Sequence, residues 1–138
     1  MFVLDSSDNF SPEQYGHLKE GLSTLIDETF DLSPDVVQVG FVEYSDKASV
    51  PVALGHYEDK VQLLTDIANS EQLFGEAIVL KGLNAARQQF QLHGRKNVPR
   101  VLLLITNGVN REIRRCDFHL WLITNERHIL LFAPLMPR

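Results

Sequence analysis

The sequence contains a single cysteine, Cys116, among its 138 residues. A lone cysteine excludes an intramolecular disulfide and any zinc site built from several cysteines. The chain has no apolar run near the roughly 18–20 residues that a membrane helix needs, so we expect no membrane partner. Lys and Arg number 13 against 18 Asp and Glu, and the net charge of −5 gives no electrostatic basis for binding nucleic acid.

The start of the chain also lacks the pattern of a secretory signal peptide. The residues M-F-V-L run directly into Asp5, without a basic segment followed by a longer apolar one. We therefore expect a chain translated as written to be cytoplasmic or of unknown location.

Short apolar runs alternate along the chain with amphipathic stretches. Strands are predicted at residues 1–4, 36–44, 48–54 and 101–105, and helices after Ser11 and at 57–68 and 76–92. This order predicts an α/β layer structure with a mostly parallel sheet. Because proline cannot donate a hydrogen bond to a neighbouring strand, Pro51 places its strand at a sheet edge.

The first helix has the clearest local start signal. Ser11 suits the N-cap, Pro12 suits the first helical position, and Gln14 completes an S-x-x-Q capping box. Apolar residues three and four positions apart then predict the buried face of this helix: Leu18, Leu22, Leu25, Ile26 and Phe30.

Two polar loops follow apolar strands in the predicted sheet. Residues 5–9, D-S-S-D-N, follow the first strand, and residues 106–108, T-N-G, follow the strand at 101–105. In open α/β sheets, ligands bind beyond the carboxyl ends of the central strands. The sequence therefore predicts that these two loops lie side by side at one edge and form the candidate site.

Several motifs together resemble one known family. These are F-V-L-D-S-S near the start, N-F before a helix, V-G-F-V-E-Y-S-D, G-E-A-I, and V-P-R-V-L-L-L-I-T-N-G. In this order and spacing, from about Phe2 to Gly108, they resemble the von Willebrand factor type A domain, most of all the A domains of collagen type VI alpha chains. The resemblance implies a Rossmann-like three-layer fold.

The resemblance also implies a divalent-cation site, usually for Mg²⁺, at the end of the sheet. Asp5 and Ser7 match the family pattern D-x-S-x-S, and Asn9 stands at its last position if no residues are missing. Gln72 falls where the family has a Thr, and Asn107 replaces the Asp of its T-D-G. Hard cations bind through charged oxygen ligands. We therefore predict a degenerate metal site of Asp5, Ser7 and Asn107, with at most weak Mg²⁺ binding and no other cofactor.

The composition changes after Gly108. Residues 1–108 hold 8 Lys and Arg against 15 Asp and Glu, whereas residues 109–138 hold 5 against 3. The later stretch lacks the helix and strand units that the family resemblance implies. We predict a partial A domain at 1–108, incomplete at its C-terminus, and a divergent tail at 109–138.

The resemblance implies a module that binds a protein and performs no catalysis. A matrix component such as collagen is one candidate partner, and relatives of this kind are secreted into the extracellular matrix. Two alternatives stay open from the sequence. One is a non-functional product of a decayed or alternatively spliced gene. The other is a Mg²⁺-dependent phosphohydrolase with Asp5 as nucleophile, assisted by Thr106 and by Lys81 or Lys96.

Overall fold

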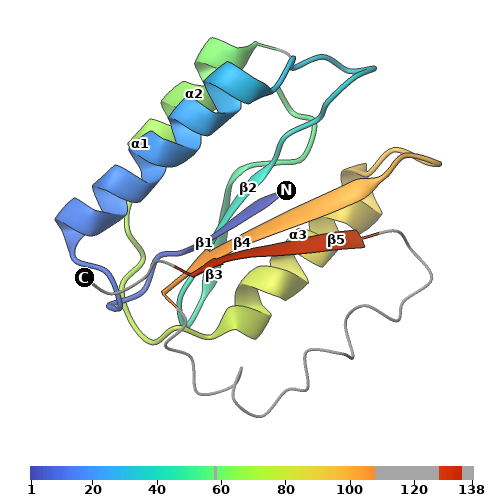
Figure 1. Ribbon diagram of the computed structural model, residues 1–138. Helices are drawn as coiled ribbons and strands as arrows, with labels where there is room; N and C mark the ends of the chain where they lie inside the picture. Colours follow the sequence, from blue (N-terminus) through green and yellow to red (C-terminus); the bar gives the residue numbers. More distant parts are fainter. Residues whose placement is uncertain (58, 108–127, 135–138) are drawn as a thin grey trace.

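The computed structural model describes residues 1–57, 59–107 and 128–134 (Figure 1). Its elements in chain order are β1 (Phe2–Asp5), α1 (Pro12–Thr29), β2 (Phe41–Tyr44), β3 (Ala48–Val52), α2 (Lys60–Asn69), α3 (Val79–His93), β4 (Arg100–Thr106) and β5 (His128–Pro134). The predicted α/β class is confirmed. Among the described helices, none combines the length and the apolar character that crossing a bilayer requires.

The five strands form one mixed sheet in the order β3-β2-β1-β4-β5. β1 pairs in parallel with β2 and β4, and β4 pairs in parallel with β5. Only the β2–β3 pair is antiparallel, since a short turn joins these two strands. β3 lies at an edge of the sheet, as Pro51 predicted, and the first strand of the chain lies at its centre.

Helices cover both faces of the sheet, as a three-layer fold requires. α1 and α2 lie together over one face, and α3 lies over the other (Figure 1). Successive β1 side chains point to opposite faces. Phe2 and Leu4 therefore join the core beneath α1 and α2, whereas Val3 joins the core beneath α3.

The predicted start of α1 is confirmed in detail. The Ser11 hydroxyl accepts a hydrogen bond from the Gln14 backbone N–H at 3.2 Å, and the Gln14 side chain accepts one from the Ser11 backbone N–H at 2.9 Å. The predicted apolar face is wrong at Leu25, which is 44% exposed, while Tyr15 is buried. Tyr15 lies on the same helix face as Leu22 and Ile26, and its hydroxyl donates to a polar partner within the core.

The strand expected at 36–44 is shorter than predicted. Regular pairing begins at Phe41, which lies opposite Phe2 of β1 and Val52 of β3. β1 begins at Phe2 and β3 ends at Val52, so earlier residues such as Val36 lie beyond both neighbouring strands, and Val36 is 60% exposed. The sheet neighbours set this boundary, and residue preference does not.

The sequence analysis did not predict strand β5. It pairs with β4 along its whole length, from Arg100 opposite His128 to Thr106 opposite Pro134. Part of the stretch predicted to be a divergent tail therefore extends the same sheet. The remaining tail residues, 109–127 and 135–138, lie outside the described residues, and the domain boundary at 108 stays a prediction.

Candidate functional site

The two predicted loops lie side by side where β1 and β4 end. These strands are parallel neighbours, so their carboxyl ends reach the same edge of the sheet. The Thr106 hydroxyl donates a hydrogen bond to the Asp5 carboxylate at 3.2 Å, across 101 residues of chain. The predicted juxtaposition is confirmed, although Gly108 lies outside the described residues.

Asp5 is the hydrogen-bond acceptor around which the first loop folds. Its side chain is fully buried. Oδ1 accepts from the Ser7 backbone N–H at 3.1 Å and from the Ser7 hydroxyl at 2.6 Å. Oδ2 accepts from the Thr106 hydroxyl and, at 3.4 Å, from the Asn9 side-chain amide. Both oxygens of this carboxylate thus satisfy donors of the protein itself.

The two amide residues of the candidate site also hold the first loop in place. The Gln72 amide donates to the backbone carbonyls of Ser7 at 3.0 Å and Phe10 at 2.9 Å. The Asn107 amide donates to the Asn9 carbonyl at 3.2 Å. The structure thus brings Asp5, Ser7 and Asn107 to one loop edge, and these residues join the loops by hydrogen bonds.

The charge of the ligands decides how well these loops could hold a divalent cation. Mg²⁺ requires several oxygen ligands in octahedral geometry, and affinity grows with the number of charged ligands. Among the described residues, Asp5 is the one carboxylate buried at the loops, and its oxygens already accept hydrogen bonds. Within the described part of the chain, no three His, Cys, Asp or Glu side chains are grouped to hold a metal ion. Burial raises the pKa of the adjacent Tyr44 hydroxyl, and the charge of Asp5 raises it further, so this group stays neutral.

A buried carboxyl, which the sequence analysis missed, lies beneath the loops on the other face of the sheet. Glu43 of β2 is 1% exposed and accepts a hydrogen bond from the Tyr15 hydroxyl. The Lys19 ammonium lies 5.4 Å from the Tyr15 ring and donates to the Ala68 carbonyl at 2.9 Å. The sequence could have indicated Glu43, because it is the single acid in the apolar run V-G-F-V-E-Y. An acid that is buried with such a strand needs a hydrogen-bond or charge partner.

Glu43→Gln is expected to flatten the pH dependence of stability. Desolvation raises the pKa of Glu43, while hydrogen bonds from Ser70 and Tyr15 and the charge of Lys19 oppose the rise. The folded state thus holds this proton more tightly than the unfolded state, so Glu43 destabilises the fold as pH rises above about 4.5. A glutamine side chain at this position does not ionise and carries no such cost.

Urea unfolding at a series of pH values measures this effect. The stability of Glu43→Gln relative to the unsubstituted chain should increase between acid and neutral pH, by about 1.4 kcal/mol for each unit of pKa shift. If the difference in unfolding free energy between the two proteins stays constant across this pH range, the pKa of Glu43 is the same in the folded and unfolded states.

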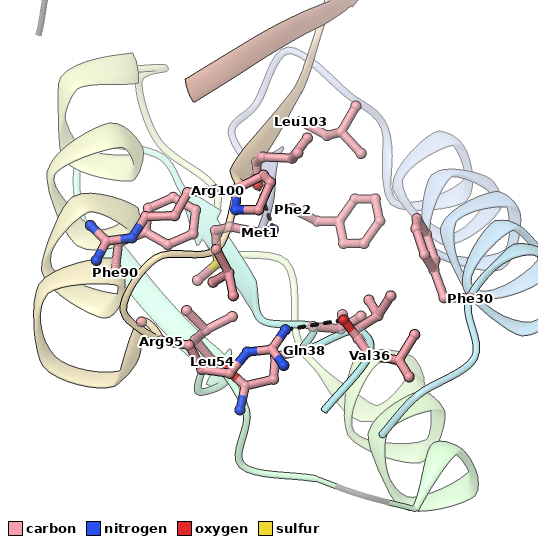
Figure 2. Close-up of a pocket in the computed structure, with 16 residues that line it drawn as sticks. Met1, Phe2, Phe30, Val36, Gln38, Leu54, Phe90, Arg95, Arg100 and Leu103 are labelled. Carbon is pink, nitrogen blue, oxygen red and sulfur yellow. Dashed lines mark hydrogen bonds between the residues drawn. The ribbon is translucent and has the colours of Figure 1, made fainter. Parts of the chain in front are cut away.

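A cavity lies at the opposite end of the sheet, near the starts of β1 and β4. The cavity has a volume of about 250 Å³. Figure 2 shows Phe2, Phe30 and Leu103 along its apolar wall. The Arg95 guanidinium at its rim donates to the Pro34 carbonyl at 2.6 Å and to the Val36 carbonyl at 3.1 Å. Arg95 therefore anchors the segment before β2.

Comparison with known proteins agrees with the geometry. The family model described as von Willebrand factor type A domain matches residues 1–118. The mouse (Mus musculus) collagen alpha-4(VI) chain is 32% identical over 111 residues, which are 80% of this chain and 5% of that one. The human (Homo sapiens) collagen alpha-6(VI) chain is 27% identical over 116 residues, 81% of this chain and 5% of that one. The chain therefore spans a small part of these relatives.

A solved structure has the same fold. It is that of proximal thread matrix protein 1 from the mussel byssus, described with a zinc-occupied MIDAS motif. The superposition has a TM-score of 0.77 and 24% sequence identity, and it covers 95% of this chain and 34% of that chain. The likeness extends over nearly the whole chain.

Proposed function

Because the chain belongs to the von Willebrand factor type A domain family, we propose that it is a non-enzymatic module that binds another protein without a metal ion. The observation that carries this proposal is the burial and hydrogen bonding of the Asp5 carboxylate. Among the described residues its carboxylate is the single acid buried at the loop edge, and both its oxygens accept hydrogen bonds from the loops that it joins. We infer that the metal site of the family is degraded here.

The relatives favour a partner in the extracellular matrix. Collagen VI alpha chains match four-fifths of this chain, and the mussel protein that shares its fold is named as a thread matrix protein. We propose that this domain likewise acts in the matrix and binds a matrix protein such as collagen. We infer that the zinc of the mussel structure does not transfer, since Gln72 and Asn107 can offer a cation only amide oxygens without negative charge, and the N–H groups of both amides bind backbone carbonyls.

Surface plasmon resonance over immobilised collagen tests this proposal. We expect the purified chain to bind, with the same affinity in Mg²⁺ and in EDTA, because the described loops offer a cation one buried carboxylate. Isothermal titration calorimetry with Mg²⁺ alone should give no binding heat below about millimolar concentration. Micromolar Mg²⁺ affinity, or collagen binding abolished by EDTA, would contradict a metal-free mode. Absent binding in both buffers would contradict the matrix partner.

The phosphohydrolase alternative has less support from the site. A nucleophilic carboxylate must attack phosphorus, and Mg²⁺ must hold the phosphate beside it. Asp5 is fully buried and bound by Ser7 and Thr106, and Ser7 stands where such enzymes need a second Asp. The decayed-gene alternative likewise gains no support, since two continuous cores pack on both faces of the sheet.

A further inference from the structure

Phe74 presents an aromatic ring to solvent from an unfavourable backbone conformation. Its side chain is 48% exposed, and its φ is +57°, in the left-handed region. Bulky side chains rarely adopt this region, which costs roughly 1–2 kcal/mol for a residue with a Cβ atom. The exposed ring therefore gains little from burial while its backbone is strained, a combination that points to a use outside the fold.

Hydrogen bonds from the first loop fix Phe74 in this conformation. The Phe74 backbone N–H donates to the Ser6 carbonyl at 2.9 Å, and the Leu73 N–H donates to the Ser6 hydroxyl at 2.8 Å. On the other side, the Asp8 N–H donates to the Gly75 carbonyl at 3.0 Å. The ring is thus presented on a rigid support beside the candidate site, which lowers the entropy cost of using it as a contact.

Four exposed carboxylates lie in or beside the segment that carries this ring. Glu71 and Glu76 flank it in the chain, Asp8 bonds to its neighbour Gly75, and the Asp46 carboxylate lies 3.1 Å from where a Cβ at Gly75 would stand. None of the four has an ion-pair partner among the residues that the structure describes.

Three lysines offset part of this charge: Lys47 and Lys81 are exposed, and the Lys19 ammonium donates to the carbonyl of Ser70, next to Glu71. The surface around Phe74 therefore keeps an excess of negative charge, because no bound cation is expected at the loops to offset it.

We propose that Phe74 and its acidic surroundings form a docking surface for a basic segment of a partner protein, with an arginine or lysine stacked on the ring. Cations favour aromatic faces, and nearby carboxylates strengthen the attraction. A second copy of this chain fits less well, because identical acidic surfaces repel one another. The inference rests on the proposed protein-binding function and specifies the chemistry of the partner.

Fluorescence anisotropy with a labelled peptide of repeated Gly-Arg-Leu triplets tests the inference. We expect this peptide to bind the full chain, more weakly as salt rises, and a control peptide with glutamate for every arginine not to bind. Phe74→Asn removes the ring but keeps a residue that tolerates the left-handed conformation. It should weaken peptide binding about 5- to 20-fold while raising the Tm by about 2–5 °C.

Leu92→Asn is the matched control, since Leu92 is 65% exposed near the far end of α3. It should leave peptide binding unchanged. Three results would overturn the inference. The arginine peptide could bind Phe74→Asn as tightly as the unsubstituted chain, the glutamate peptide could bind the unsubstituted chain as tightly as the arginine peptide, or neither peptide could bind. A lower Tm for Phe74→Asn would also overturn it, because the ring would then serve the fold. Collagen binding is read separately, so failure of the matrix partner remains distinguishable from failure of this surface.

Discussion

Asp5→Ala is expected to lower the free energy of unfolding by about 3–5 kcal/mol. The substitution removes the acceptor for the Ser7 backbone N–H, the Ser7 hydroxyl, the Thr106 hydroxyl and the Asn9 amide. Each buried donor left unpaired costs about 1–3 kcal/mol, and local rearrangement recovers part of this. Urea unfolding measures the loss, which should be the same in Mg²⁺ and in EDTA.

Asp8→Ala provides the matched control in the same loop. Asp8 is exposed, and its hydrogen bond to Gly75 uses the backbone N–H, which the substitution keeps. Its effect should stay within about 0.5 kcal/mol. If Asp5→Ala also falls within about 1 kcal/mol of the unsubstituted chain, the carboxylate does not hold the loops together. A loss seen only in Mg²⁺ would assign it to a bound cation instead.

Gly82→Ala is the second substitution with a large expected effect. Alanine normally stabilises a helix interior by up to about 1 kcal/mol over glycine. At position 82 of α3, however, a Cβ would lie 2.7 Å from Cδ1 of Tyr44 and 2.8 Å from Cγ1 of Val3. Both side chains are fully buried in central strands and cannot move aside. We expect a net loss of about 1–3 kcal/mol, measured by thermal or urea unfolding.

Gly21→Ala tests the same substitution without the contact. Gly21 lies inside α1, and a Cβ there would meet no atom within 4 Å. This variant should gain about 0.5–1 kcal/mol from helix propensity alone. If the two variants change stability alike, α3 does not pack closely on β1 and β2 through Gly82.

Local chemistry made part of the fold predictable from sequence. The capping box at Ser11 acts within one helical turn, so its residues alone identify the start of α1. The meeting of Asp5 with Thr106 followed from topology, because parallel neighbouring strands end at one edge. The start of β2 at Phe41 could not be predicted from local sequence, since it depends on where β1 begins and where β3 ends.

Other features of the site depend on partners far away in the chain. Gln72 could be aligned with a family position, but its bonds to Ser7 and Phe10 cross more than 60 residues and carry no local pattern. Glu43 was visible as an isolated acid, yet its partner Tyr15 was hidden on a helix face assigned to leucines. The left-handed conformation of Phe74 also lacks a sequence signal, because the residue type argues against it.

The central position of β1 has a consequence for biosynthesis. This strand leaves the ribosome well before its β4 neighbour, which ends 101 residues after Asp5. At a translation rate of about 5–20 residues per second, one edge of β1 stays unpaired for roughly 5–20 s. Unpaired edges of apolar strands template aggregation. β1 is paired on both edges in the finished sheet, yet during synthesis one of its edges stays unpaired and open to aggregation until β4 has been made.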